Sequence, residues 1–212
     1  VMKNYKKNIE LLTKNHVYSK EMEHDACGVG LIASTEGKKS RAIVEYGIEA
    51  LKAVWHRGAV DADGKTGDGA GIHIEIPKDF FIEKIEVTGH DYDKSEICVG
   101  MIFLPRNDYT AQENCKTIVE SELTKNNFSI YGWRQVPVNP KVLGEKALQT
   151  MPEIIQVLFK SNDSNLVDKN LERKIYETRK KIENKAFNES LNNFYICSIS
   201  SKSIIYKGLY LA

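Results

Sequence analysis

The chain alternates between short apolar runs and longer segments whose apolar residues recur at helical spacing. From Ser40 to about His56 the apolar positions repeat every three to four residues, which predicts a helix with Ser40 as its N-cap and Gly58 as its C-cap. The same pattern predicts helices at 108–127 and 166–187. The short apolar or alternating runs predict strands at 27–33, 72–76, 96–105, 128–138 and 154–160, and a hairpin of 194–200 with 203–211.

This order of elements indicates the fold class. Strands outnumber helices, and neighbouring strands often follow one another directly, so we expect an α+β domain of mixed sheets covered by helices. Residues 1–26 are polar and charged, with only a weak helical pattern, and they end where the first predicted strand begins. We therefore expect them to be an appendage to the folded domain.

Charge and composition exclude several classes of function. The 212 residues include 30 basic and 29 acidic ones, so no strong overall field attracts nucleic acid or anionic lipid. No apolar run is long enough to span a membrane, and the first 26 residues lack the apolar stretch of a secretory signal. The four cysteines lie far apart and form no zinc-ligand spacing. These features favour a protein in a reducing interior.

Cys27 begins the first predicted strand and has two interpretations. It can be a small buried hydrophobic residue, as isolated cysteines usually are. It can also be a nucleophile that becomes the N-terminus when the bond after Ala26 is cut. The freed α-amine, with a pKa of about 7.7 to 8, would then accept the proton of a thiol whose pKa is about 8.5. Gly28 would leave room for a substrate, and His24 is poorly placed to serve as a separate base.

Two motifs after the first predicted helix also allow two interpretations each. In "HRG", Arg57 can stabilise the helix C-terminus, or its planar guanidinium can bind a carboxylate near the nucleophile. In "TGDGAG", Gly67 and Gly69 can form a wide turn, or they can let a ligand approach the backbone. Asp68 can accept hydrogen bonds from a substrate ammonium group or hold the shape of the loop.

The remaining candidates for chemistry are weak. "TGDGAG" lacks the Lys-Ser/Thr ending of a phosphate loop and leads into a strand, so it predicts neither a phosphate nor a dinucleotide site. His16, His73 and His90 have no partner at metal-ligand spacing, and we expect no metal site.

Several stretches together resemble a known family. "CGVGLIAS", "IEALKAVWHRGAVDADGKTGDGAGI", "YGWRQVPV", "ERKIYETRKKIEN" and "FYICSISSKSIIYKGLYLA", in this order, are similar to the N-terminal glutaminase domain of glutamate synthase large subunits. The resemblance runs from Cys27 to Ala212. It implies a class II glutamine amidotransferase with the N-terminal-nucleophile hydrolase fold, in which two mostly antiparallel sheets lie between two helical layers (αββα).

The resemblance also implies roles for residues and partners. Residues 1–26 match a propeptide whose removal exposes Cys27, and Arg57, Gly67, Asp68 and Gly69 match substrate-binding positions. The substrate would be L-glutamine, hydrolysed to glutamate and ammonia, and the ammonia would serve reductive transfer to 2-oxoglutarate in nitrogen assimilation. The whole enzyme would use FMN and an iron–sulfur cluster outside this chain, and its partners would be the rest of the large subunit and a small reductase subunit. Its location would be the cytoplasm, or the plastid stroma in a eukaryote.

The chain departs from the family in two segments. It contains neither the Arg-Phe-Ser-Thr-Asn segment that helps hold glutamine nor the His-Asn-Gly-Glu segment of the oxyanion hole. We therefore expect residues 27–212 to be the N-terminal part of a glutaminase domain, incomplete at its C-terminal side and nearly inactive when isolated. Two alternatives remain: another class II amidotransferase, or a non-catalytic assembly module of the same fold.

Overall fold

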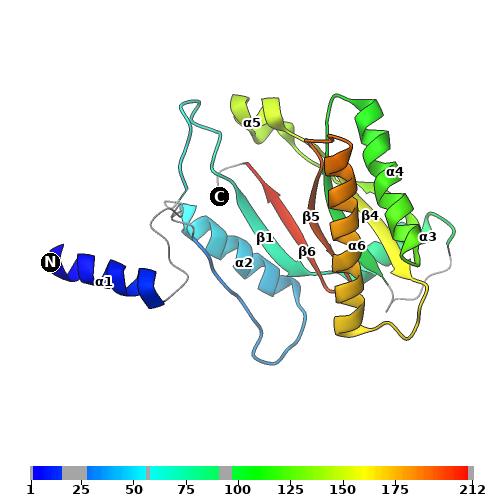
Figure 1. Cartoon of the computed structure of the whole chain (residues 1–212), viewed down its shortest axis with the longest axis horizontal. Coiled ribbons are helices and arrows are strands. Elements are labelled where there is room, and N and C mark those ends of the chain that lie inside the picture. Colours follow the sequence, from blue (N-terminus) through cyan, green and yellow to red (C-terminus); the bar gives the residue numbers. More distant parts are fainter. Residues whose placement is uncertain (1, 16–27, 56–57, 91–96, 210–212) are drawn as a thin grey trace.

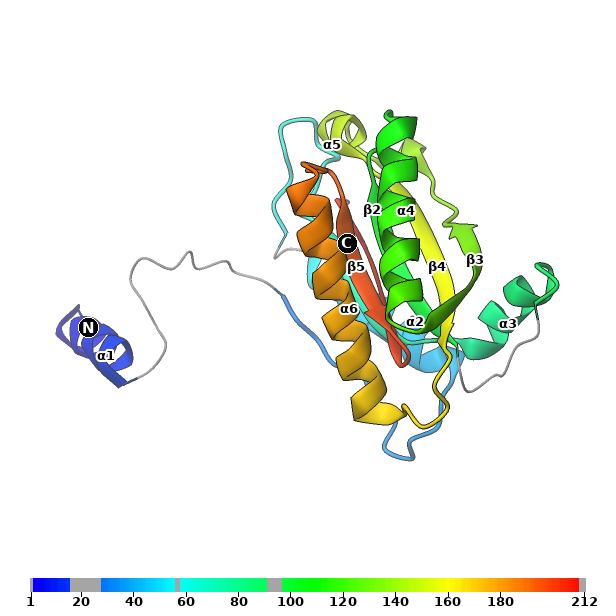
Figure 2. The same cartoon turned by 45° about the vertical axis from the view of Figure 1, so that its right-hand side comes forward.

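The computed structural model describes residues 2–15, 28–55, 58–90 and 97–209. Helix α1 (Met2–Asn15) lies apart from a layered body formed by the later residues (Figures 1 and 2). Within these ranges, no helix combines the length and the apolar character that crossing a bilayer requires.

A four-stranded antiparallel sheet is the centre of the body. Its strand order is β3-β4-β2-β5, so β2 and β4 are the inner strands. Every neighbouring pair is antiparallel. The strands are β2 (Cys98–Leu104), β3 (Phe128–Gln135), β4 (Glu153–Ser161) and β5 (Tyr195–Ser200).

Helices α4 (Tyr109–Lys125) and α6 (Asp168–Asn188) cover one face of this sheet (Figure 2). The Asp108 side chain caps α4 by accepting a hydrogen bond from Ala111 N at 2.9 Å, which satisfies a free amide of the first turn. In β2, alternate residues point to opposite faces, so Cys98 and Ile102 join the core beneath the helices while Val99 and Met101 join a second core. Burial on both faces explains the continuous apolar run of this strand.

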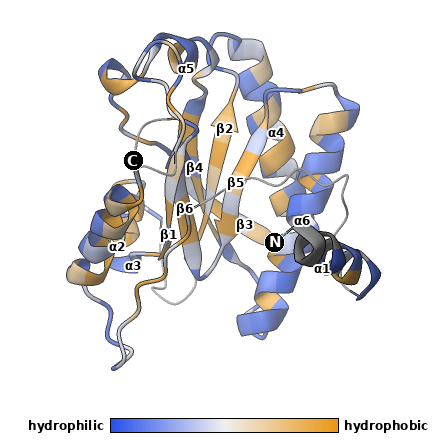
Figure 3. Cartoon of the chain, turned by 90° about the vertical axis from the view of Figure 1, so that its left-hand side faces the viewer, coloured by the Kyte–Doolittle hydropathy of each residue, from blue (hydrophilic) through white to orange (hydrophobic). Residues whose placement is uncertain are grey.

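The second core separates the four-stranded sheet from a two-stranded antiparallel sheet of β1 (Ala70–Glu75) and β6 (Ser203–Gly208). Helix α3 (Lys78–Glu86) closes this core with Phe81 and Ile85, which are fully buried. Helix α2 (Arg41–Ala53) packs on the outer side of β1. The layers are thus helices, sheet, sheet and helix, as Figure 3 shows from the side. This order confirms the expected αββα arrangement.

The predicted strand at 27–33 is wrong for the residues that the structure describes. Residues 28–33 have no regular secondary structure, and the side chains of Val29 and Leu31 are 91% and 89% exposed. The alternation of apolar residues is present, but no described strand pairs with this segment. A strand needs a neighbour that takes its hydrogen bonds, and local pattern alone does not supply one.

The predicted hairpin of 194–200 with 203–211 is also corrected. Strands β5 and β6 follow one another directly, but β5 pairs with β2 and β6 pairs with β1. The turn between them therefore carries the chain from one sheet to the other. Ser200 Oγ accepts hydrogen bonds from Lys202 N and Ser203 N at 2.9 and 3.2 Å, which stabilises this tight corner.

Glu172 of α6 holds the same corner from outside. Its carboxylate accepts hydrogen bonds from Ser200 Oγ at 2.9 Å and from Ser201 N and Oγ at 2.8 and 2.6 Å. We expect Glu172→Ala to lower the free energy of unfolding by about 1 to 3 kcal/mol, because the substitution leaves these donors without an acceptor in a partly buried place. Urea denaturation measures the change.

Glu177→Ala is the matched control on the same helix. Among the described residues, Glu177 accepts a hydrogen bond only from the exposed Arg173, at 3.0 Å, an interaction expected to contribute about 0.3 to 0.5 kcal/mol. Equal losses in the two variants would contradict the role assigned to Glu172.

Candidate active site

The structure describes three of the five predicted site residues. Gly67, Asp68 and Gly69 lie in the connection between α2 and β1. Cys27 and Arg57 lie outside the described residues, so their roles stay predictions. We call residues 58–69 the glycine loop.

Backbone hydrogen bonds make the glycine loop a narrow arch with two paired sides. Val60 and Gly67 form an isolated antiparallel bridge. Asp61 N donates to Thr66 O at 2.9 Å, and Asp68 N donates to Ala59 O at 3.2 Å. Gly67 is buried within the arch, whereas Asp68 and Gly69 are exposed. The loop therefore has a defined shape of its own, unlike a simple wide turn.

The Asp68 side chain helps to close the arch. Its Oδ2 accepts a hydrogen bond from Ala59 N at 2.8 Å, so Asp68 and Ala59 are joined by two hydrogen bonds. This contact is the one expected if Asp68 holds the shape of the loop. Because Ala59 follows Arg57 by two residues, the same contact holds the backbone just after the "HRG" motif.

Gly69 joins the arch to the two-stranded sheet. Its φ of +113° lies in a region that favours glycine, and a Cβ here would lie 3.1 Å from the carbonyl oxygen of Gly208. The next residue, Ala70, pairs with Gly208 as the first pair of β1 and β6. Glycine at 69 thus permits a close approach of the loop to the end of β6.

The tip of the loop is stabilised by two carboxylates that the sequence interpretation did not single out. Asp63 Oδ1 accepts from Lys65 N and Thr66 N at 2.9 and 2.7 Å, and its Oδ2 accepts from Thr66 Oγ1 at 2.5 Å. The hydroxyl of Thr66, and then the backbone amides, hold the pKa of Asp63 well below its usual range. Asp61 Oδ2 accepts from Lys146 Nζ at 2.6 Å, which lowers the pKa of Asp61 and raises that of Lys146. Both carboxylates are therefore ionised at neutral pH.

The described cysteines are unsuited to nucleophilic chemistry. Cys98, Cys115 and Cys197 are all buried. Burial raises the pKa of Cys115 to about 11 and also raises the pKa of Cys197. A thiol needs to be both accessible and deprotonated to attack a substrate, so none of these three buried cysteines is a candidate nucleophile.

This burial predicts a large difference in thiol reactivity. At pH 8, a thiol of pKa about 11 is about 0.1% ionised, so we expect iodoacetamide to modify Cys115 at least about 100-fold more slowly than a free cysteine. Peptide mass spectrometry of the folded protein over a time course measures the rate, and the denatured protein is the control. Equal rates of modification in the folded and denatured protein would contradict the burial of this thiol.

The described residues offer no second site with recognisable chemistry. Within these ranges, no group of three His, Cys, Asp or Glu side chains could hold a metal ion. His90 Nδ1 shares a hydrogen bond of 2.8 Å with Thr88 Oγ1. An open cleft of about 500 Å³ is lined by His73 and Lys39, and another of about 610 Å³ by Arg106 and Trp133. Neither cleft is lined by the glycine loop.

A family model described as class-II glutamine amidotransferases matches residues 27–212. The match therefore begins at Cys27, includes "HRG" and the glycine loop, and extends to the last residue.

The chain is also similar to individual proteins, all of them glutamate synthases. The chain is 52% identical over 208 residues to the glutamate synthase (NADPH) large chain of Azospirillum brasilense, an alignment that covers 98% of this chain and 14% of the relative. It is 40% identical over 189 residues to the ferredoxin-dependent glutamate synthase 1 of Arabidopsis thaliana, covering 88% of this chain and 12% of the relative. A ferredoxin-dependent glutamate synthase 2 of Synechocystis is 37% identical with similar coverage. The chain thus spans about one-seventh or less of the length of these relatives.

Proposed function

This chain belongs to the class-II glutamine amidotransferases, and from that premise we propose that it is the glutaminase portion of a glutamate synthase, releasing ammonia from L-glutamine. The observation that carries the proposal is the 52% identity to the Azospirillum large chain, which extends over nearly the whole chain. The family match from Cys27 onward supports the same reaction class.

Cys27 is the proposed nucleophile. After cleavage between Ala26 and Cys27, the α-amine accepts the thiol proton, and the thiolate attacks the side-chain amide carbon of glutamine. The resulting oxyanion collapses to a glutamyl thioester as the amide nitrogen takes up a proton and leaves as ammonia. Water then attacks the thioester, releasing glutamate and restoring the thiol. One residue thus provides both the nucleophile and the base.

Residues 1–26 are the proposed propeptide. The family match starts directly after them. The alignment with the Azospirillum relative covers 98% of this chain and therefore continues into these residues. Cleavage would free the amine that the mechanism requires.

Arg57 and the glycine loop are the proposed glutamine-binding elements. A guanidinium binds a carboxylate through two parallel hydrogen bonds, which suits the α-carboxylate of glutamine. The contact of Asp68 with Ala59 supports this assignment, because it restrains the backbone two residues after Arg57. Gly67 and Gly69 would let the substrate approach the loop backbone.

The whole enzyme is proposed to use the ammonia in reductive synthesis of glutamate. Its FMN and iron–sulfur cluster would be held by the rest of the large subunit. The proposed partners are the rest of the large subunit and a small reductase subunit, and the matched relatives include both an NADPH enzyme and ferredoxin-dependent enzymes. The proposed location is the cytoplasm, or the plastid stroma in a eukaryote.

The experiment uses the protein purified at its natural length with its natural partners. We expect it to release ammonia and glutamate in equal amounts from glutamine, and 6-diazo-5-oxo-L-norleucine to stop this reaction by modifying Cys27. Peptide mass spectrometry locates the modified residue. Absence of ammonia release, or inactivation by labelling at another residue, would overturn the proposal.

A further inference from the structure

The glycine loop is supported by a segment that lies about eighty residues later in the chain. Helix α5 (Glu145–Thr150) belongs to the connection between β3 and β4 of the four-stranded sheet. From this helix, Lys146 Nζ donates to Asp61 Oδ2 at 2.6 Å, and Ala147 N makes a long contact of 3.5 Å with Thr66 Oγ1. The loop continues into β1 of the two-stranded sheet, but its tip is attached to a connection of the four-stranded sheet.

Gly144, just before α5, lies directly against the tip of the loop. A Cβ atom built at this position would overlap Asp63 Oδ2 and both Oγ1 and the backbone nitrogen of Thr66. These atoms belong to the hydrogen-bonded tip of the loop, in which the Asp63 carboxylate holds the amide and hydroxyl of Thr66. There is therefore no space for a side chain at position 144. Any residue larger than glycine must displace the tip of the loop or disrupt its hydrogen bonds.

The two contacts differ in strength. Lys146 and Asp61 form an exposed ion pair, with side chains that are 69% and 31% accessible, so charge attraction alone restrains the loop weakly. Gly144 and Thr66 are buried, so their contact is a steric constraint that solvent does not weaken. We therefore expect the close fit at Gly144 to determine the position of the loop more strongly than the ion pair does.

We propose that Gly144 and Lys146 are positioning residues for glutamine binding. They hold the glycine loop against α5 and thereby fix Ala59 and the backbone that follows Arg57. The inference rests on the proposed function, because it takes Arg57 and the glycine loop as the substrate-binding elements. Neither residue touches the substrate; each acts through the loop. With its two ends continuing from α2 and into β1, and its tip against α5, the loop is restrained at three places.

The test measures glutaminase kinetics of the natural-length protein and its Gly144→Ala, Lys146→Ala and Lys146→Arg variants. For Gly144→Ala we expect the KM for glutamine to rise about tenfold while kcat changes less than about twofold, because displacement of a binding loop weakens substrate binding first. For Lys146→Ala we expect a rise in KM of about two- to threefold, which Lys146→Arg restores. Gln149→Ala is the control, because Gln149 is exposed on the same helix and is expected to leave both constants unchanged.

The outcomes separate this inference from the proposed function. An active parent protein labelled at Cys27, combined with an unchanged KM in Gly144→Ala, would overturn the positioning role and leave the proposed function standing. A fall in kcat with unchanged KM would show only a loss of folded enzyme and would also overturn it. If Gly144→Ala does not fold, the test depends on Lys146→Ala and on the restoration of KM by Lys146→Arg. An unchanged KM in Lys146→Ala would then overturn the positioning role. A parent protein that releases no ammonia overturns both proposals.

Discussion

Replacing Cys27 with alanine in a leader-free, natural-length protein is expected to lower the rate of ammonia release from glutamine by at least about 1,000-fold, because the substitution removes the nucleophile and no other described thiol can replace it. Cys98, Cys115 and Cys197 are all buried. Coupled assay of ammonia and glutamate at saturating glutamine measures the loss. The leader-free form is used so that a failure of cleavage does not imitate a failure of chemistry.

Cys115→Ala is the matched control for this prediction. The same atom is removed, but from a fully buried thiol in the core beneath α4 and α6. We expect kcat to remain within about twofold of the parent and stability to fall modestly, because a small cavity forms. Undiminished ammonia release in the Cys27 variant, or equal losses of activity in both, would contradict the role assigned to Cys27.

Replacing Phe159 with alanine is expected to lower the free energy of unfolding by about 3 to 5 kcal/mol, the cost of removing a large aromatic side chain from a packed core. Phe159 lies on the inner strand β4, is fully buried and packs edge-to-face on Phe128 with ring centroids 5.4 Å apart. The cavity would lie between the four-stranded sheet and the helices. The midpoint of urea unfolding, followed by circular dichroism, measures the effect.

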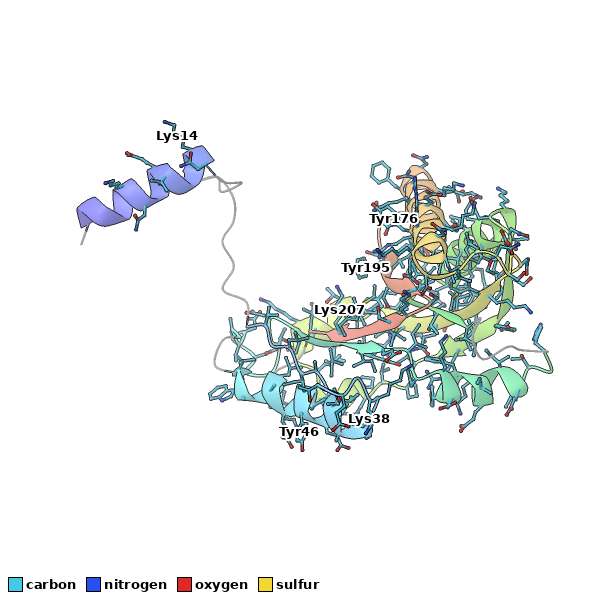
Figure 4. All side chains as sticks on the ribbon, turned by 90° about the horizontal axis from the view of Figure 1, so that it is seen from below. Lys14, Lys38, Tyr46, Tyr176, Tyr195 and Lys207 are labelled. Atoms are coloured by element: carbon cyan, nitrogen blue, oxygen red, sulfur yellow. The ribbon has the colours of Figure 1, made fainter. Side chains whose placement is uncertain are left out.

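Phe187→Ala provides the control with the same residue type. Phe187 is 80% exposed near the end of α6, so its replacement is expected to change stability by less than about 0.5 kcal/mol. Tyr176, another exposed aromatic side chain of α6, is labelled in Figure 4. Similar losses for both phenylalanines would contradict the described core.

Elements whose signal is local were predicted well from the sequence. The helical spacing after Ser40 corresponds to α2, but this helix ends at Ala53 with Val54 as its C-cap, not at Gly58, and the Ser40 side chain makes no capping hydrogen bond. The apolar run at 96–105 was correctly predicted as a strand, and the run is continuous because both faces of β2 meet a core. Helices α3 and α5 were not predicted. Each is short, so its few apolar positions give little periodicity to detect.

Features that depend on contacts between residues far apart in the sequence could not be predicted from the local pattern. Residues 28–33 alternate like a strand but have no described neighbour, and β5 and β6 adjoin in sequence but belong to different sheets. The same limit applies to the candidate site. The glycine loop was predicted from its composition, but its support by Gly144 and Lys146 comes from about eighty residues away, where nothing in the local sequence marks it. The turn-forming Asp63 could have been identified, because aspartate before glycine is a common turn signal.

The most direct test of the central claim is the mass of the N-terminal peptide of the active, natural-length protein. If one residue provides both thiol and amine, the active species begins at Cys27, and the peptide carries a free α-amine. An active protein that retains residues 1–26 ahead of Cys27, with full glutaminase activity, would contradict the account.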